Sequence, residues 1–290
     1  MAGLACIVAC TSSLAQTPTA GVMATAEPSL TPAQHLMTDE FVISAGAFVM
    51  ATGLTGSLDG NATGAGVSRD VNFDQAFGTN SNSTRVRADL SWRFLPRHRL
   101  RFQYFDDDVK KTRTLDKDIV WGDYTFKAAG QATAEYRFTV YQLDYEYVFV
   151  REPNYEIAAS AGVHYSELTL GISGNAAVTL PDGTVQAASF QTASSTVPAP
   201  LPVLGLRGAW AVAPHWYLDA SAQAFKFKVN PVDGHWWDLR VGATWMYNDH
   251  VGIGAGWDSF TTHMGVDKTH FQGHIDTRYS GLVVYLKGAF

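Results

Sequence analysis

The chain has 290 residues, with 27 acidic side chains against 21 Lys and Arg, which gives a formal net charge of −6. This balance excludes a globally basic nucleic-acid-binding protein. Charged residues make up only 17% of the chain, against roughly a quarter in soluble domains. The 46% hydrophobic content excludes a disordered polypeptide.

The first residues predict export. An apolar stretch from Gly3 to Cys10 precedes Ser13-Leu14-Ala15, which resembles a secretory cleavage site, although the basic start is missing. We predict a signal peptide over residues 1–15 and an exported linker over residues 16–40, which are rich in Thr, Ala and Pro. Both cysteines, Cys6 and Cys10, fall in the signal peptide, so neither disulfides nor thiolate-bound metals are expected in the mature chain. Lipidation at Cys10 is the alternative, because Ile7-Val8-Ala9-Cys10 resembles a lipoprotein cleavage box.

Beyond residue 40 the hydrophobic pattern repeats every two residues, which is typical of half-buried strands. From Arg85 to Phe94 the apolar side chains take the even positions and the polar ones take the odd positions. On a strand these two sets project to opposite faces. The same split recurs near residues 99–104, 141–149, 156–165, 204–210, 216–223, 237–245 and 251–258.

The connections alternate in length. Tight turns are expected at 95–98, 152–154, 213–215 and 247–250, and long polar loops at about 59–83, 111–132, 173–198 and 262–277. Within these loops, residues 70–78 are expected to fold back as a lid or an additional strand, and residues 181–184 to form a hairpin tip. Short turns at one end and long loops at the other are typical of outer-membrane barrels.

The fold class is therefore predicted as all-β, an antiparallel up-and-down transmembrane β-barrel over residues 41–290. Ten strands are expected, with eight or twelve as alternatives, over residues 41–57, 84–95, 99–110, 133–151, 155–172, 199–212, 216–229, 235–247, 250–261 and 278–290.

The chain ends on a strand pattern in which Leu282, Val284, Leu286 and Phe290 share one parity. This tail resembles the C-terminal strand of Gram-negative outer-membrane β-barrel proteins, although Gly288 departs from the aromatic residue common two positions before the end. The architecture is similar to small barrels of the OmpA-like and OmpW-like type. The resemblance implies a place in the cell outer membrane, contact with outer-membrane lipid, and recognition of Phe290 by the barrel-assembly machinery.

The polar parity places seven cations and seven carboxylates inside the barrel. Arg99 shares that parity but is left out because it lies beside a turn. Unpaired charge away from water is costly, so these side chains are expected to form ion pairs. About eight strands leave room only for side chains, so the lumen is predicted to be plugged. The predicted interior charges are Arg85, Arg87, Asp89, Arg93, Arg101, Asp144, Glu146, Glu156, Arg207, Asp219, Asp238, Arg240, Asp258 and Lys287.

We therefore predict a non-enzymatic barrel without cofactors. It is either structural or binds an extracellular ligand through its four long loops. A narrow passive pore or transport channel is the first alternative.

An outer-membrane hydrolase is the second alternative. His164-Tyr165-Ser166 resembles the His-x-Ser spacing of lipid A deacylases, but parity turns His164 and Ser166 inward, and Glu167 is too close to serve as the third member. Asp106-Asp107-Asp108 with Asp249-His250 would resemble the acidic residues and His of omptin proteases, but the two groups are expected at opposite ends of the barrel. No catalytic residue is therefore predicted.

The loop over residues 262–277 contains His263, His270 and His274 together with Asp267. Spacings of seven and four in a flexible segment do not predict a preformed metal site. These residues are interpreted as surface histidines.

Overall fold

The structure is a computed structural model that describes residues 29–58, 71–78, 83–121, 124–179, 184–229, 232–268 and 271–290. Residues Thr31–Phe290 form one compact unit. The predicted signal peptide, with Cys6 and Cys10, lies outside the described residues.

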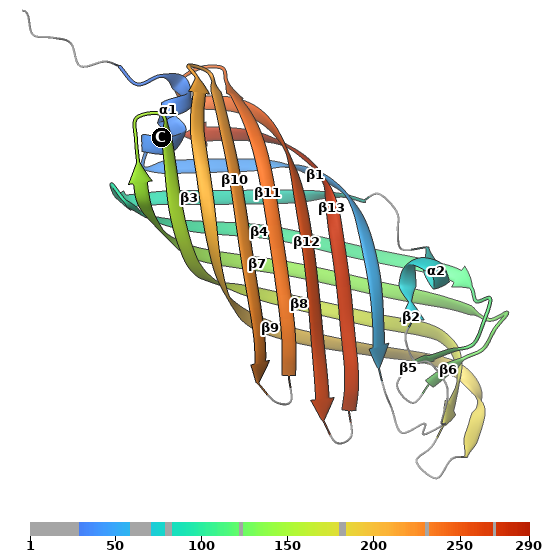
Figure 1. Ribbon diagram of the computed structural model, residues 1–290. Coiled ribbons are helices and arrows are strands. Elements are labelled where there is room, and N and C mark those ends of the chain that lie inside the picture. Colours follow the sequence, from blue (N-terminus) through green and yellow to red (C-terminus); the bar gives the residue numbers. More distant parts are fainter. Residues whose placement is uncertain are drawn as a thin grey trace, which may run out of the picture. The chain divides into compact units, whose positions relative to one another are not determined.

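Ten long antiparallel strands form a closed barrel, which confirms the predicted fold class and strand number. Each strand pairs with the next long strand along the chain, and the first pairs with the last (Figure 1). The strands are β1 (Phe41–Leu58), β3 (Ser83–Leu95), β4 (His98–Thr114), β7 (Gln131–Arg151), β8 (Tyr155–Thr179), β9 (Val185–Ala213), β10 (Trp216–Val229), β11 (Val232–Met246), β12 (Val251–Lys268) and β13 (Phe271–Ala289).

The two ends of the barrel differ. The predicted tight turns lie at one end, where Phe290 also pairs with Phe41, and we call this the turn end. Pro96, Pro153 and Pro214 lie in these turns or beside them, where a missing backbone N–H costs the sheet no hydrogen bond. The opposite end, where the other hairpins close, is called the hairpin end.

Most of the described residues in the predicted long loops lie in strands, which corrects the sequence interpretation. β8 and β9 stay paired as far as Thr179 and Val185, and β12 and β13 as far as Lys268 and Phe271. The described outward side chains of these extensions, such as Asn175, Thr192, His263 and Asp276, are largely polar, so their composition resembles that of a loop. The predicted hairpin tip at 181–184 lies mostly outside the described residues, but the flanking strands run directly toward it.

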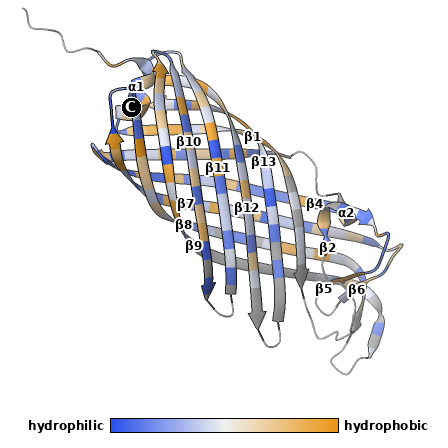
Figure 2. Ribbon diagram, viewed as in Figure 1, coloured by the Kyte–Doolittle hydropathy of each residue, from blue (hydrophilic) through white to orange (hydrophobic). Residues whose placement is uncertain are grey.

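Apolar side chains cover the outside of the turn-end half. Leu90, Trp92 and Leu239 are 38 to 41% exposed, whereas Arg87, of opposite parity, is only 7% exposed. Apolar and polar residues alternate along the strands (Figure 2). Exposed aromatic side chains mark both edges of this apolar band. The edge toward the hairpin end is marked by Tyr141, Tyr165 and Trp237, and the edge near the turns by Trp92, Phe94, Tyr147, Phe149, Trp210, Trp216, Trp245 and Tyr247.

The polarity of both faces exchanges part-way along the strands, as β7 shows most clearly. From Phe149 to Tyr141 the outward residues are apolar, and the inward residues include Glu146, Asp144 and Gln142. Beyond Tyr141 the outward residues become Thr139, Arg137 and Glu135, while Val140, Phe138 and Tyr136 are buried inside. The hairpin-end half is therefore a conventional barrel with an apolar core, and the turn-end half is its inverse.

A short helix closes the turn end. Helix α1 (Pro32–Thr38) begins with Pro at its first position, and the Gln34 side chain accepts a hydrogen bond from the Thr31 N–H at 2.8 Å. Ala33, Leu36 and Met37 pack with Tyr217 and Met246 in a buried apolar cluster. The last part of the predicted linker is thus an ordered helix rather than an irregular segment. No helix in the described part of the chain is long and apolar enough to cross a bilayer, a finding that does not concern strands.

Short elements cover the hairpin end: β2 (Val71–Asn72), α2 (Phe73–Phe77), β5 (Ile119–Trp121) and β6 (Tyr124–Phe126). β2 pairs with β1, so the segment predicted as a lid or additional strand supplies both a strand and a helix. Phe73 and Phe77 are fully buried, and the Phe73 ring meets Trp121 edge to face at 5.4 Å. These rings extend the apolar core of Phe48, Phe105, Tyr136, Phe138, Leu170, Phe260 and Tyr279.

The apolar band predicts a position-dependent cost for an outward charge. Leu143 is 53% exposed in the middle of the band, and Leu143→Arg should lower the free energy of unfolding in lipid by about 2–4 kcal/mol. Glu167→Arg, beyond the edge of the band, should change it by no more than about 1 kcal/mol. Urea unfolding in lipid vesicles measures both. Equal costs at the two positions would show that the band does not face hydrocarbon.

Candidate functional site: the ionic interior

The charged side chains of the turn-end half meet inside the barrel. Glu156 of β8 is 2% exposed and forms ion pairs with three guanidinium groups. Arg93 Nη2 lies 2.9 Å and Arg207 Nη1 lies 3.3 Å from its carboxylate, and Arg99 is the third partner. Burying one carboxylate among three cations requires further anions nearby, because unpaired buried charge is costly.

Glu146 of β7 supplies such an anion. Its carboxylate lies 3.1 Å from Arg101 Nη1 and 3.6 Å from Arg99 Nη1. Arg99 therefore bridges Glu146 and Glu156, which lie on neighbouring strands. Arg101 in turn reaches Asp89, at 4.0 Å, and so connects this cluster to the next one.

A second cluster lies nearer the hairpin end. Arg240 Nη2 is 2.6 Å from Asp238 and its Nε is 3.2 Å from Asp258. Arg87 pairs with Asp258 and, at 3.3 Å, with Asp89. Here carboxylates outnumber cations, whereas arginines predominate around Glu156. The two clusters compensate each other through Asp89 and Arg101.

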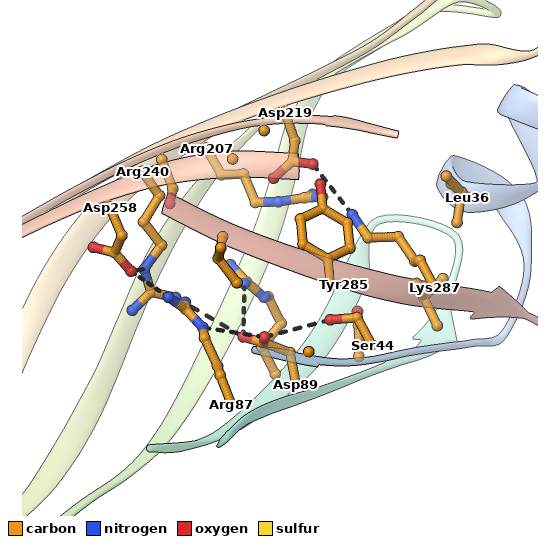
Figure 3. A pocket seen from close by; sticks show the side chains of 18 of the residues that line it. Leu36, Ser44, Arg87, Asp89, Arg207, Asp219, Arg240, Asp258, Tyr285 and Lys287 are labelled. Atoms are coloured by element: carbon orange, nitrogen blue, oxygen red, sulfur yellow. Dashed lines mark hydrogen bonds and ion pairs between the residues drawn. The ribbon is translucent and has the colours of Figure 1, made fainter. Parts of the chain in front are cut away.

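A cavity of about 100 Å³ lies between the two clusters, and Figure 3 shows its lining. Lys287 enters it from β13, 3.2 Å from Asp219 and with its ammonium nitrogen 5.0 Å from the rings of both Tyr217 and Tyr285. Leu36 of α1 lies on the turn-end side of this cavity. The apolar cluster of α1 therefore separates the cavity from the turn end.

The structure brings most of the predicted interior residues together. Arg87, Asp89, Arg93, Arg101, Glu146, Glu156, Arg207, Asp219, Asp238 and Arg240 all belong to these clusters or line their cavity. Arg85 lies apart and pairs with Asp107 at 2.9 Å. Asp144 instead accepts hydrogen bonds from Gln142 and, at 2.8 Å, from Gln223.

Arg99 was wrongly left out of the interior set. It lies next to the turn that joins β3 and β4, yet it is only 3% exposed, because its guanidinium group lies inside the barrel between Glu146 and Glu156. The parity of Arg99 predicted the right location, and only its closeness to the turn argued against an interior position. Gly162 is also part of the site, since a Cβ at this position would collide with the Asp144 carboxylate.

The groups that resembled catalytic motifs do not assemble. His164 is fully buried in the interior against Trp236, with ring centroids 3.6 Å apart, away from any lipid-facing surface. Asp107 pairs inward with Arg85, whereas Asp108 faces outward and pairs with Arg137 at 3.2 Å. Asp249 and His250 lie at the opposite, turn end, where the His250 ring stacks on Phe290.

A second cavity, of about 280 Å³, opens at the hairpin end between the β2–α2 segment and residues 115–120. Asp118 lines it and accepts hydrogen bonds at 2.8 Å from Lys127 Nζ and at 2.8 Å from the Ala128 N–H. These two bonds, the one from Lys127 foremost, hold the pKa of Asp118 below its usual range. The carboxylate thus serves to fix the turn after β6.

The chain matches no family model and no curated protein in sequence. Its fold is similar to that of the outer membrane protease OmpT from Escherichia coli, with a TM-score of 0.53, 10% identity, and coverage of 92% of this chain and 100% of that chain. The fold is that of a Gram-negative outer-membrane β-barrel. At this identity the similarity concerns the fold alone.

Two other matches have lower TM-scores. The toluene transporter TodX from P. putida gives 0.37 at 9% identity, covering 90% of this chain and 93% of that chain. The attachment invasion locus protein Ail of Yersinia pestis gives 0.32 at 8% identity, covering 86% of this chain and 99% of that chain.

The position of Glu156 predicts a large stability effect. Glu156→Gln leaves three guanidinium groups without their shared carboxylate and should lower the free energy of unfolding by about 3–5 kcal/mol. Glu135→Gln, which removes an exposed partner of Lys110 and Arg137, should cost no more than about 1 kcal/mol. Denaturant unfolding of the two folded variants gives the comparison. A cost for Glu156→Gln no larger than that for Glu135→Gln would contradict the assigned pairing.

Proposed function

We propose that this protein is an integral outer-membrane β-barrel with a closed, non-conducting interior that presents extended hairpins at the cell surface. The exchange of polarity along the strands carries this proposal. An outward apolar face over a charged interior suits a bilayer, and an outward polar face over an apolar core suits water.

The dimensions of the apolar band support a membrane location. A tilted transmembrane strand needs about 9–11 residues to cross the hydrocarbon. On β7 the band runs from Tyr141 to Phe149, which matches this length. We assign the turn end to the periplasm and the hairpin end to the cell exterior, because short turns and long hairpins divide in this way in such barrels.

Closure at three levels favours a plugged lumen over a pore. α1 and its apolar cluster cover the periplasmic end, the ion pairs cross the middle, and the apolar core with α2 fills the external end. An ion entering from either side would have to displace buried apolar side chains. The passive pore or transport channel is therefore the second candidate.

The external hairpins are the part that we propose for recognition of an extracellular ligand. β8 and β9 remain paired well beyond Tyr165, which marks the edge of the band. Paired strands hold their tips at a defined distance from the membrane, and variable tips on a rigid barrel are a common arrangement for binding.

A non-enzymatic role accords with the placement of the candidate catalytic groups. A serine nucleophile needs a base and an orienting carboxylate at one reachable site. His164 is sealed inside the barrel, and the Asp106–Asp108 and Asp249–His250 groups lie at opposite ends. Phe290 directly follows the last strand and is 61% exposed, which is compatible with the predicted role in barrel assembly.

Planar-bilayer recording tests the closed interior. The full-length protein should insert and give no sustained conductance, and deletion of residues 30–38 should leave it closed, because the external apolar core remains. Membrane fractionation and heat-modifiable migration in detergent gels show that each protein is inserted and folded. Steady open currents from the folded wild-type protein would overturn the closed interior in favour of the pore.

The surface role predicts a loss of binding on shortening a hairpin. Replacing residues 180–183 with Asn-Gly shortens the connection between β8 and β9 and leaves every described strand pair in place. Intact cells that display this variant should bind solid or cellular surfaces less than cells that display equal amounts of the wild-type barrel. Unchanged binding would remove this hairpin from the proposal.

A further inference from the structure

A row of histidine and aspartate side chains lies on the outward face of β11, β12 and β13, just beyond the apolar band. His235 is directly opposite His263, and His263 is directly opposite Asp276. Asp233 lies two residues before His235 and therefore shares its face. Trp237, two residues after His235, belongs to the edge of the band, so the row lies outside the hydrocarbon.

His263 is at the centre of this row. Its Nδ1 is 2.6 Å from Asp276 Oδ1, and its Nε2 is 3.9 Å from Asp233 Oδ2. The rings of His235 and His263 stack with their centroids 5.2 Å apart. One ring nitrogen of His263 is thus held by a carboxylate, and the other faces a second carboxylate beside another imidazole.

This arrangement has the parts of a three-ligand metal site. Two residues at i and i+2 on one strand and a third directly opposite on the next strand bring three side chains to one patch, because opposed Cβ atoms lie about 4.5–5.5 Å apart. Ligand atoms of a tetrahedral Zn²⁺ site lie roughly 3.3 Å from each other. The 3.9 Å between His263 Nε2 and Asp233 Oδ2 exceeds this only slightly.

As the side chains lie, no three His, Cys, Asp or Glu residues in the described part of the chain are grouped as metal ligands. Only small side-chain rotations are needed to bring the three ligands together. The side chains of His263 and Asp233 are 29% and 49% exposed, so they can rotate without disturbing the core. Lys226 and Lys228 lie opposite His235 and Asp233, but both are exposed, and water and salt screen their repulsion.

We propose that Asp233, His235 and His263 bind a divalent transition-metal ion of the Zn²⁺ class, with the fourth position open to water. Imidazole and carboxylate ligands select this class of ion over Ca²⁺ and Mg²⁺, which prefer oxygen alone. Asp276 is the positioning residue, since its carboxylate holds Nδ1–H of His263 and leaves Nε2 to face the metal. The ion joins β11 to β12 at the external surface of the barrel.

Calorimetric titration of Zn²⁺ into the tag-free, full-length barrel in detergent tests the site. We expect saturable binding of one ion per chain, and with Co²⁺ the visible absorption of a tetrahedral complex. His263→Ala, His235→Ala and Asp233→Asn should each abolish this binding or weaken it by more than tenfold. Asp276→Asn should weaken it by about 10–100-fold, the usual effect of losing an outer-shell partner, and should retain the Co²⁺ spectrum at saturating metal.

His98→Ala is the matched control, because His98 lies at the turn end beside Tyr145, at 2.6 Å, and far along the strands from the row. It should bind Zn²⁺ as the wild-type barrel does. Heat-modifiable migration shows that each variant is folded, which is expected because the substituted side chains are on the surface. The proposal is overturned if the folded wild-type barrel binds no Zn²⁺, or if His263→Ala and His98→Ala bind it equally well.

Discussion

A charged side chain inside a ten-stranded barrel reaches neither bulk water nor the lipid headgroups, and the cost of this isolation organises the turn-end half of the molecule. Each guanidinium group must find a carboxylate, and each carboxylate must find a donor, or the barrel loses several kcal/mol. Glu156 meets this requirement by serving three arginines from three different strands. The ion pairs therefore connect distant strands across the interior. An apolar lining would leave these strands joined only through the hydrogen bonds along their edges.

The other half of the barrel obeys the opposite rule. Beyond Tyr141 the surroundings are aqueous in our assignment, so burial of Phe138, Tyr136 and the α2 rings stabilises the structure by the ordinary hydrophobic effect. The two halves share the same strands, and at the edge of the apolar band the apolar and polar residues of these strands exchange faces. Sliding the barrel along the membrane normal in either direction would place charges in hydrocarbon or apolar residues in water. The exchange thereby fixes the depth of insertion.

The alternation of residues was sufficient to predict the barrel, its strand number and most of the interior charges, because a period of two assigns each side chain to a face without tertiary information. The exchange of polarity was also present in the sequence, since the apolar parity changes from even to odd between Val140 and Tyr141. It was missed because the alternation in the predicted strand over residues 133–151 was followed only from Tyr141 to Phe149, and the opposite parity of Tyr136, Phe138 and Val140 was not considered. α1 was missed because seven residues in a Pro- and Thr-rich segment carry only a weak helical pattern, and its stability comes from packing against Tyr217 and Met246.

What sequence spacing could not provide is strand register. The spacing of His263 and His274 along the chain did not predict a metal site. His235, which lies on another strand, was not considered with them. Pairing of β11 with β12 places His235 beside His263, and pairing of β12 with β13 adds Asp276. The same reasoning separates fold from activity. OmpT shares the architecture, but a barrel scaffold supports many functions, and chemistry depends on which side chains the register brings together. In this chain the register brings ion pairs together inside the barrel and imidazole with carboxylate outside it, so the features that distinguish the protein lie in its cross-strand pairs rather than in the barrel itself.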